Sequence, residues 1–125
     1  MKNDTICALS TPAGAGGVAV IRVSGDNSRF FAEKMFAPAG RTAVKDFEPY
    51  RMYTGEFDAG DFKDFGMLVL FHAPKSYTGE DMAEFHVHGG VAVVRGMLKR
   101  LADLGCRYAE RGEFTRRAFL NGKLS

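Results

Sequence analysis

The chain lacks tryptophan and has only two cysteines and four prolines among its 125 residues. Cys7 and Cys106 make no disulfide framework of the kind that stabilises small secreted domains. No apolar run approaches the roughly 18 residues that a membrane-spanning helix needs. Met1–Asp4 leads directly into a strand-like segment, without the apolar stretch of a signal peptide. These absences predict a reduced, cytoplasmic protein that has no membrane segment.

The composition is that of a folded domain. Hydrophobic residues make up 46% and charged residues 26% of the chain, which argues against disorder. A length of 125 residues suits one compact domain, covering 1–125. Glycine is in excess, with fifteen residues against roughly nine in an average chain of this length. The glycines form short clusters without a period, which excludes a collagen-like sequence and indicates several tight turns.

The charge is small in total but unevenly distributed. The formal net charge is +2, which does not by itself indicate nucleic-acid binding. The segment from Arg95 to Lys123, however, contains eight basic and three acidic residues, a net charge of +5. We therefore expect either an ordinary solvated helix face or a basic face for an anionic ligand or partner.

Hydrophobic periodicity and turn signals predict an α+β domain. The expected strands lie at 5–10, 18–23, 50–57, 66–72 and 82–88, and the expected helices lie at about 28–35, 91–104 and 115–120. The segment 36–49 contains two prolines and mixed charge and is expected to be a loop. This order predicts a mixed, mostly antiparallel sheet of about five strands with about three helices.

Two glycine patterns resemble nucleotide-binding motifs without their context. Gly14–Ala19 satisfies G-x-G-x-x-G/A, but a β-branched strand follows it where a dinucleotide site needs a helix N-terminus. We therefore interpret 11–17 as a connection between two strands. Gly122 and Lys123 are followed by Leu124 and lack the upstream glycine of a Walker A loop. The chain thus has no motif for nucleotide hydrolysis.

Arg22 is the most informative single residue, because it lies near the end of a strand whose other residues are apolar. An unpaired guanidinium in such a place is costly, so it needs an anionic or electron-rich partner. The partner is either internal, with Glu84 the obvious candidate, or external, as a ligand carboxylate or carbonyl. Position alone does not decide between them.

Glu84, His86 and His88 alternate along the strand expected at 82–88 and share one of its faces. With a third ligand such as His72 they could form a metal site, but we favour a polar face that lines a pocket or interface. A carboxylate there suits a ligand edge with two adjacent N–H donors. Hydrolase chemistry has little support, because neither cysteine has a histidine nearby in the sequence.

Three separated segments resemble the N-terminal domain of the MnmE family, also called TrmE, of tRNA modification GTPases. They are DTICALSTPAGAGGVAVIRVSG (Asp4–Gly25), SYTGEDMAEFHVHGG (Ser76–Gly90) and RGEFTRRAFLNGKL (Arg111–Leu124). Their order and spacing agree with the family, and together they bracket almost the whole chain. The chain departs from the family at Arg111, where proline is usual, and at Ser125, where aspartate is usual.

The resemblance implies a fold like the folate-binding domain of aminomethyltransferases, a constitutive homodimer and a site for 5-formyl- or 5,10-methylenetetrahydrofolate. Arg22, Glu84 and Lys123 match the family's folate-contacting residues, which favours an external partner for Arg22. A pterin would present its amino and ring N–H groups to Glu84, and Arg22 or Lys123 would neutralise the carboxylated tail. We assign no catalytic and no metal-binding residue.

Full members of the family continue into a helical domain and a GTPase domain that binds GTP, Mg²⁺ and K⁺, and they contribute a C-terminal lysine to the folate site. The resemblance thus implies that this chain is one domain of a longer protein. With the FAD-dependent partner MnmG (GidA), that protein adds an aminomethyl or carboxymethylaminomethyl group at C5 of the wobble uridine of tRNA. Two alternatives remain, namely a purely structural dimerisation domain and a folate-dependent aminomethyltransferase-like fragment.

Overall fold

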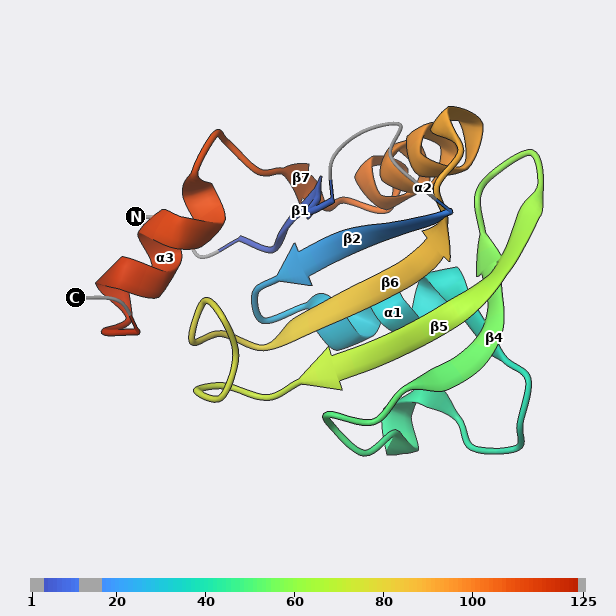
Figure 1. The fold of residues 1–125 in the computed structure, drawn as a ribbon. Helices are drawn as coiled ribbons and strands as arrows, with labels where there is room; N and C mark the ends of the chain where they lie inside the picture. Colours follow the sequence, from blue (N-terminus) through green and yellow to red (C-terminus); the bar gives the residue numbers. More distant parts are fainter. Residues whose placement is uncertain (1–3, 12–16, 124–125) are drawn as a thin grey trace.

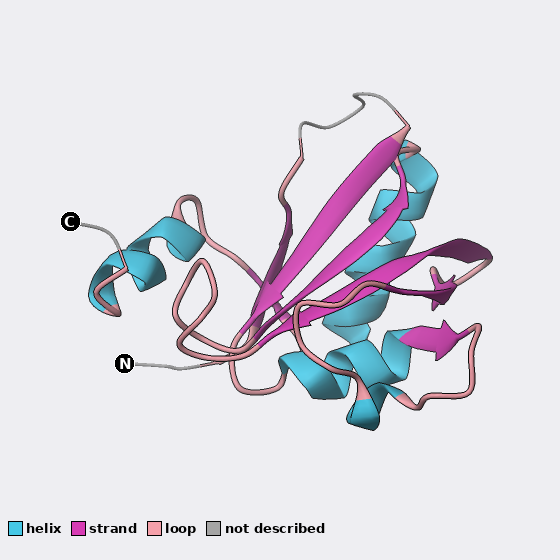
Figure 2. Ribbon diagram, turned by 60° about the horizontal axis from the view of Figure 1, so that its bottom comes forward, coloured by secondary structure: helices cyan, strands magenta, loops and turns pink. Residues whose placement is uncertain are grey.

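A computed structural model describes residues 4–11 and 17–123 of the chain. They form a twisted, mostly antiparallel sheet with two helices packed against one of its faces (Figure 1). The third helix stands apart from these two, beyond one end of the central strands (Figure 2). Among the described residues, no helix is long and apolar enough to cross a membrane.

Seven strands make up the sheet, in the spatial order β3-β4-β5-β6-β2-β1-β7. Their bounds are β1 Ile6–Leu9, β2 Val18–Ser24, β3 Phe36–Pro38, β4 Tyr53–Asp58, β5 Lys63–Phe71, β6 Met82–His88 and β7 Arg107–Tyr108. All neighbouring pairs are antiparallel except β1 and β7. The helices are α1 Ser28–Met35, α2 Val91–Asp103 and α3 Glu113–Leu120, and a short 3₁₀ helix, η1, covers Val44–Asp46.

The hydrophobic core lies between one face of the sheet and the helices α1 and α2. Ile21, Phe85 and Leu68 are paired across β2, β6 and β5, and all three are fully buried. Because successive side chains of a strand point to opposite faces, this register gives the core one face of the sheet. The helices complete the core with side chains at helical spacing, namely Phe31, Ala32, Met35, Met97 and Leu101.

The opposite face of the sheet carries no helix in the described part of the chain (Figure 2). We call it the open face. It includes the second set of alternating side chains on the central strands, which are Val18, Val20 and Arg22 of β2, Glu84, His86 and His88 of β6, and Phe65, Met67 and Val69 of β5.

The sequence-based fold class is confirmed, and the expected strand count is low by two. Each of the five expected strands is present, with ends that differ by up to three residues, and α1 and β6 have the expected bounds. The omitted strands are β3, within the segment expected to be a loop, and β7. They have three and two residues, too few for alternation to be visible in a sequence.

The glycine-rich connection expected at 11–17 joins two antiparallel neighbours, β1 and β2. Residues 12–16, and with them Gly14 and Gly16, lie outside the described residues. The connection leads into a strand, Val18–Ser24, and not into a helix. A dinucleotide-binding loop leads into a helix, so the strand that follows here distinguishes this connection from such a loop.

Candidate functional site

The candidate site is a charged row at the centre of the open face. Arg22 of β2 pairs directly with Glu84 of β6, and Val20 pairs with His86. The antiparallel register therefore brings Arg22, Glu84 and His86 together on one surface. Their side chains are 26%, 17% and 23% exposed, which leaves them partly accessible to a ligand.

Glu84 uses its two carboxylate oxygens for two different partners. Arg22 donates to Oε2 from Nε at 3.2 Å and from Nη2 at 3.0 Å. His86 lies with Nε2 3.2 Å from Oε1. A carboxylate only accepts hydrogen bonds, so Nε2 is the protonated nitrogen in this contact. The hydrogen bond from His86 and the nearby Arg22 guanidinium lower the pKa of Glu84, which keeps it ionised at neutral pH.

The loop between β5 and β6 forms one wall of the site. The guanidinium carbon of Arg22 lies 5.4 Å from the centre of the Tyr77 ring, within the range of a cation–π contact. The hydroxyl of Tyr77 lies 2.9 Å from that of Thr115 on α3. Tyr77 thus connects the charged row to the third helix.

A chain of buried polar contacts holds this loop. The Thr78 side chain is fully buried, and its hydroxyl lies 2.7 Å from the Ser24 hydroxyl. Ser24 also donates to Glu80 at 2.6 Å, and Arg117 of α3 donates to the same carboxylate at 3.1 Å. All three segments that carried the family resemblance meet in these contacts, because Ser24, Glu80 and Arg117 each come from a different one.

Lys123 lies beside the same loop. Its Nζ donates to the Pro74 carbonyl at 3.1 Å. Gly79 has a φ of +82°, and a Cβ there would lie 2.9 Å from Cβ of Asn121 and 3.4 Å from Cγ of Lys123. A side chain at residue 79 would therefore push Lys123 and its neighbour away. Among the described contacts, none joins Lys123 directly to Arg22 or Glu84.

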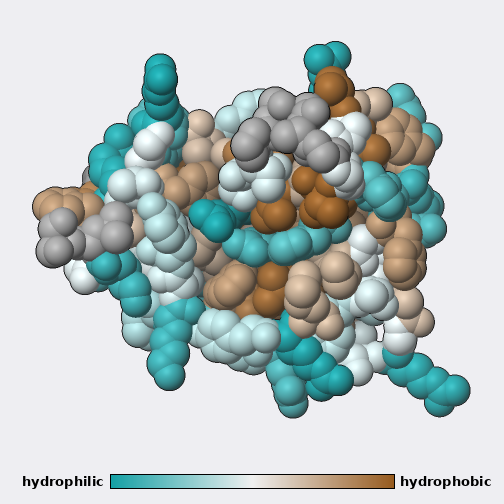
Figure 3. All heavy atoms as spheres, in the orientation of Figure 1, coloured by the Kyte–Doolittle hydropathy of each residue, from teal (hydrophilic) through white to brown (hydrophobic). Residues whose placement is uncertain are grey.

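Hydrophobic side chains flank the charged row. Val18 and Phe65 are 58% and 57% exposed, and Met67 is 39% exposed. The space-filling view of this face shows a hydrophilic row running between hydrophobic side chains (Figure 3). Exposed apolar groups around a few convergent polar groups are typical of surfaces that bind a ligand or a partner.

The histidines do not gather as a metal site would require. His88 contacts Asp64, with Nδ1 2.7 Å from Oδ1, and His72 lies with Nε2 2.9 Å from Nη2 of Arg29. Of the three histidines, only His86 contacts Glu84 within the described part of the chain. In that part, no group of three histidine, cysteine, aspartate or glutamate residues is placed to hold a metal ion.

The two cysteines lie in the core and not at the site. Cys7 and Cys106 are buried, and the Sγ of Cys106 donates to the Thr5 carbonyl at 3.6 Å. The neighbouring Cys7 thiol, together with burial, raises the pKa of Cys106. The Cys106 thiol is therefore protonated at neutral pH, which does not suit a nucleophile.

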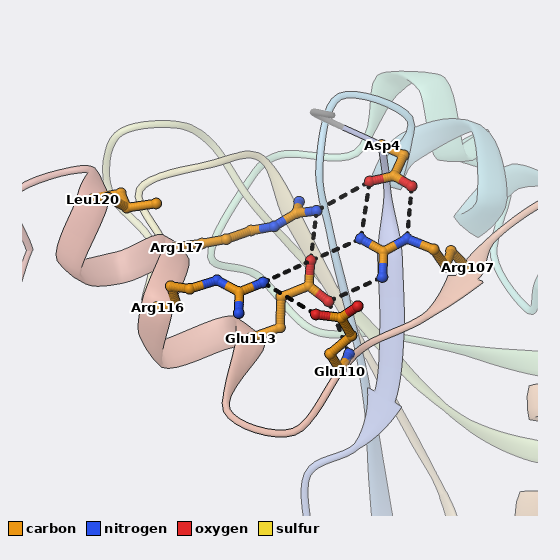
Figure 4. A pocket seen from close by; sticks show the side chains of 7 residues that line it. All are labelled: Asp4, Arg107, Glu110, Glu113, Arg116, Arg117 and Leu120. Carbon is orange, nitrogen blue, oxygen red and sulfur yellow. Dashed lines mark hydrogen bonds and ion pairs between the residues drawn. The ribbon is translucent and has the colours of Figure 1, made fainter. Parts of the chain in front are cut away.

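A second cluster of charges lies where α3 meets the N-terminal segment (Figure 4). Glu113 is 3% exposed and accepts hydrogen bonds from Arg107 at 2.7 Å, from Arg117 at 3.1 Å and from the backbone N–H of Glu110 at 2.8 Å. Asp4 accepts from Arg107 at 2.6 Å and from Arg117 at 3.2 Å. Hydrogen bonds from Arg107 are the main cause that lowers the pKa of both Asp4 and Glu113 to about 2.

Ion pairs within the fold neutralise part of the basic C-terminal segment, Arg95–Lys123. Arg107 and Arg117 contact Asp4, Arg117 also contacts Glu80, and Arg100 of α2 lies 3.1 Å from Asp58. The carboxylates at Asp4, Glu80 and Asp58 come from outside the segment. The fold thus neutralises much of the +5 charge, and these described contacts do not favour a continuous basic face.

Sequence reasoning identifies Arg22 and Glu84 and misses two of their neighbours. Tyr77 belongs to a loop without periodicity, and only the fold brings its ring to Arg22. In the sequence, His86 is part of a His-x-His pair. Strand alternation places both histidines on one face, but it does not show that His86 contacts Glu84 and that His88 contacts Asp64. The internal Arg22–Glu84 pair, one of the two alternatives that the residues leave open, is present in the structure. The external partner that the family resemblance favours stays a prediction.

The fold and the site together define a single α+β domain with helices on one face of its sheet and an open face that carries a charged row between apolar side chains. The family model described as "GTP-binding protein TrmE N-terminus" matches residues 5–123. The chain belongs to this family.

Curated relatives agree with the family assignment. The chain is 47% identical over 126 aligned residues to the tRNA modification GTPase MnmE of Fervidobacterium nodosum, which covers 99% of this chain and 27% of that protein. It is 50% identical to the MnmE of Brucella ovis, over 98% of this chain and 27% of the relative. It is 44% identical to the MnmE of Caldicellulosiruptor saccharolyticus, over 99% and 28%. The chain thus spans about a quarter of the length of these relatives.

Proposed function

We propose that this domain binds a reduced folate, 5-formyl- or 5,10-methylenetetrahydrofolate, on its open face and forms a homodimer through the same face. The observation that carries the proposal is the Arg22–Glu84 pair at the centre of that face, partly exposed and bordered by apolar side chains. The family resemblance supplies the ligand class. The domain has a binding and positioning role and supplies no nucleophile of its own.

The pair offers a hydrogen-bond pattern that complements the edge of a pterin ring. This edge presents an amino group, a ring N–H and a carbonyl in a row. Glu84 supplies two acceptor oxygens for the two donors, and Arg22 beside it supplies N–H groups for the carbonyl. In the chain by itself Arg22 occupies Oε2 of Glu84. Ligand binding therefore requires Arg22 to move from Oε2 toward the ligand.

Lys123 is the better candidate for the carboxylated tail of the folate. Arg22 touches Glu84, so it cannot reach the far end of a ligand whose pterin edge lies on Glu84. Lys123 lies beside the loop that borders the site, and its exposed Nζ donates to one carbonyl of that loop. The side chains of Val20 and Tyr77 lie next to Arg22 and offer apolar surface to the rings.

Titration of the chain with 5-formyltetrahydrofolate tests the ligand. We expect saturable binding that weakens at least about tenfold in Glu84→Ala and Arg22→Ala, since hydrogen bonds to charged groups contribute about 1.5–3 kcal/mol. Glu56→Ala, at an exposed position of β4, is the matched control and should bind as the wild type does. Equal binding by all four proteins would contradict the site, and no binding by any of them would leave the domain with dimerisation alone.

The exposed apolar residues of the open face support the second part of the proposal, the dimer. In the parent protein, by its likeness to the tRNA modification GTPases, this module would position a one-carbon unit. The GTPase domain, with GTP, Mg²⁺ and K⁺, and the FAD-dependent MnmG partner would complete modification of the tRNA wobble uridine in the cytoplasm. A purely structural dimerisation domain is the alternative, and the internal saturation of Arg22 by Glu84 is the observation that favours it.

A further inference from the structure

His86 contacts Oε1 of Glu84, the carboxylate oxygen that Arg22 does not contact. Arg22 places both of its hydrogen bonds on Oε2, whereas Nε2 of His86 lies 3.2 Å from Oε1. The two partners therefore approach the carboxylate from different strands. Arg22 comes from β2, and His86 lies two residues further along β6, the strand of Glu84 itself.

A partner on Oε1 matters because the plane of a glutamate carboxylate is not fixed by its own rotamer. The terminal torsion of glutamate is broad, so the two oxygens can take many orientations at little energetic cost. A ligand edge with two parallel N–H donors needs both oxygens in one plane with it. When Arg22 moves toward the ligand, as the proposed function requires, His86 is the partner that still orients the carboxylate.

The strand register restricts the orientation of the His86 side chain. It pairs with Val20 of β2 on one side and with Met67 of β5 on the other, and its side chain is 23% exposed. A ring flanked by two apolar side chains in the middle of a sheet has few other orientations. The charged groups near it are Glu84 on its own strand and Arg22 from β2, with the His88–Asp64 pair at the far end of β6.

We propose that His86 is a positioning residue of the folate site, which sets the plane of the Glu84 carboxylate through Nε2 and so prepares it for the two N–H donors of a pterin. The proposal rests on the proposed function for the identity of the ligand. The contact between His86 and Glu84 does not depend on the proposed function, because it is present in the chain alone. His86 needs no contact with the ligand in this role.

His88 provides a matched control on the same strand. It is also a histidine with a carboxylate partner, at 2.7 Å, but that partner is Asp64 and not Glu84. Its side chain is 68% exposed, so its replacement disturbs little packing. Any effect of losing a histidine, a charge or a polar surface group in general should appear equally at His88.

The test compares His86→Leu, His86→Gln and His88→Leu with the wild-type chain in a titration with 5-formyltetrahydrofolate. We expect His86→Leu to bind about tenfold more weakly, the loss that one hydrogen bond to a charged group produces. His86→Gln, whose amide nitrogen reaches the place of Nε2, should bind within about twofold of the wild type, and so should His88→Leu. Wild-type affinity in His86→Leu would overturn the proposal, and so would a glutamine variant as weak as the leucine variant.

A second measurement separates this proposal from the proposed function. Titration of the Glu84 carboxyl by NMR in the absence of ligand should show a higher pKa in His86→Leu than in the wild type and an unchanged pKa in His88→Leu. If the wild type binds no folate, the folate part of the proposed function fails. The positioning contact is then still supported by a raised Glu84 pKa in His86→Leu, and it is overturned by an unchanged one.

Discussion

At the scale of single residues, close contacts between backbone segments restrict which residue a position can hold, as the charge pairs do. Gly96 lies in the middle of α2, where glycine is about 1 kcal/mol less favourable than alanine. A Cβ at residue 96 would lie 2.2 Å from the carbonyl oxygen of Ala59. The glycine thus allows α2 to lie directly against the turn between β4 and β5.

Gly96→Ala should therefore destabilise the domain although alanine is the better helix former. We expect a net loss of up to about 2 kcal/mol, because the clash with a backbone atom costs about 1–3 kcal/mol and outweighs the gain of about 1 kcal/mol in helix propensity. Urea denaturation measures the loss. Gly40→Ala is the control, because a Cβ at residue 40 meets nothing within 4 Å. A stabilised Gly96→Ala variant would show that α2 does not lie this close to Ala59.

At the scale of elements, α3 differs from α1 and α2 in how it is attached. The main hydrophobic cluster includes side chains of α1 and α2 and none of α3, whose Ala118 is fully buried outside that cluster. The third helix is held mainly by Glu113 and Arg117, which bind Arg107 and Asp4 (Figure 4). Arg117 also binds Glu80. An element attached by ion pairs depends on pH in a way that an element attached by packing does not.

We expect acid to release α3. The pKa values of Asp4 and Glu113 fall from ordinary values of 3.8 and 4.5 to about 2 in the folded chain. Carboxylates with a lowered pKa stabilise the fold fully above their unfolded values, and that stabilisation is lost as the pH falls through the folded values. Between about pH 4.5 and pH 2 the nearly buried Glu113 alone should account for about 2 kcal/mol. Amide hydrogen exchange of α3 across this range measures the release.

Glu113→Gln and Glu110→Gln test the assignment of that pH dependence. Glu110 is exposed and lies 3.4 Å from Arg116, so its replacement should change little. Glu113→Gln leaves Arg107 and Arg117 short of a buried partner and should lower stability at neutral pH by about 3 kcal/mol. It should also flatten the acid transition of α3. An acid transition of the same size in Glu113→Gln and the wild type would assign the loss to other groups.

The elements show how far sequence reasoning reaches. Strands such as β6 and the helix α1 are predictable because alternation and helical spacing repeat several times within them. The strands β3 and β7 are not, since two or three residues form a strand only when a neighbouring strand is already in place. The Arg22–Glu84 pair can be anticipated from one costly charge in an apolar strand. The contacts of Tyr77 and His86 arise from loop conformation and register, which no local pattern encodes.

At the scale of the whole molecule, the open face accounts for the proposed dimer. It leaves Val18, Phe65 and Met67 exposed beside the charged row, whereas the other face of the same sheet is buried under α1 and α2. The dimer is therefore expected to resemble a sheet packed against a sheet, with the two charged rows enclosed between them.

Met67→Glu should weaken this dimer, because it places a charge in the apolar part of the contact without touching the core. Sedimentation velocity should then show a monomer for Met67→Glu at concentrations at which the wild type sediments as a dimer. Phe62→Glu is the control, since Phe62 lies in the turn between β4 and β5 and is already 40% exposed. A Met67→Glu variant that remains dimeric would place the contact on another surface.

The contacts of Asp4 have a further consequence for the order in which the chain can fold. Asp4 binds Arg107 and Arg117, which lie 103 and 113 residues after it, and β1 pairs in parallel with β7. The outer edge of β1 is therefore covered only when Arg107–Tyr108 of β7 pair with it. During synthesis the sheet can assemble from β2 to β6, but the edge of β1 is covered only after β7 has left the ribosome. Until then the β1 edge stays open to pairing with other chains.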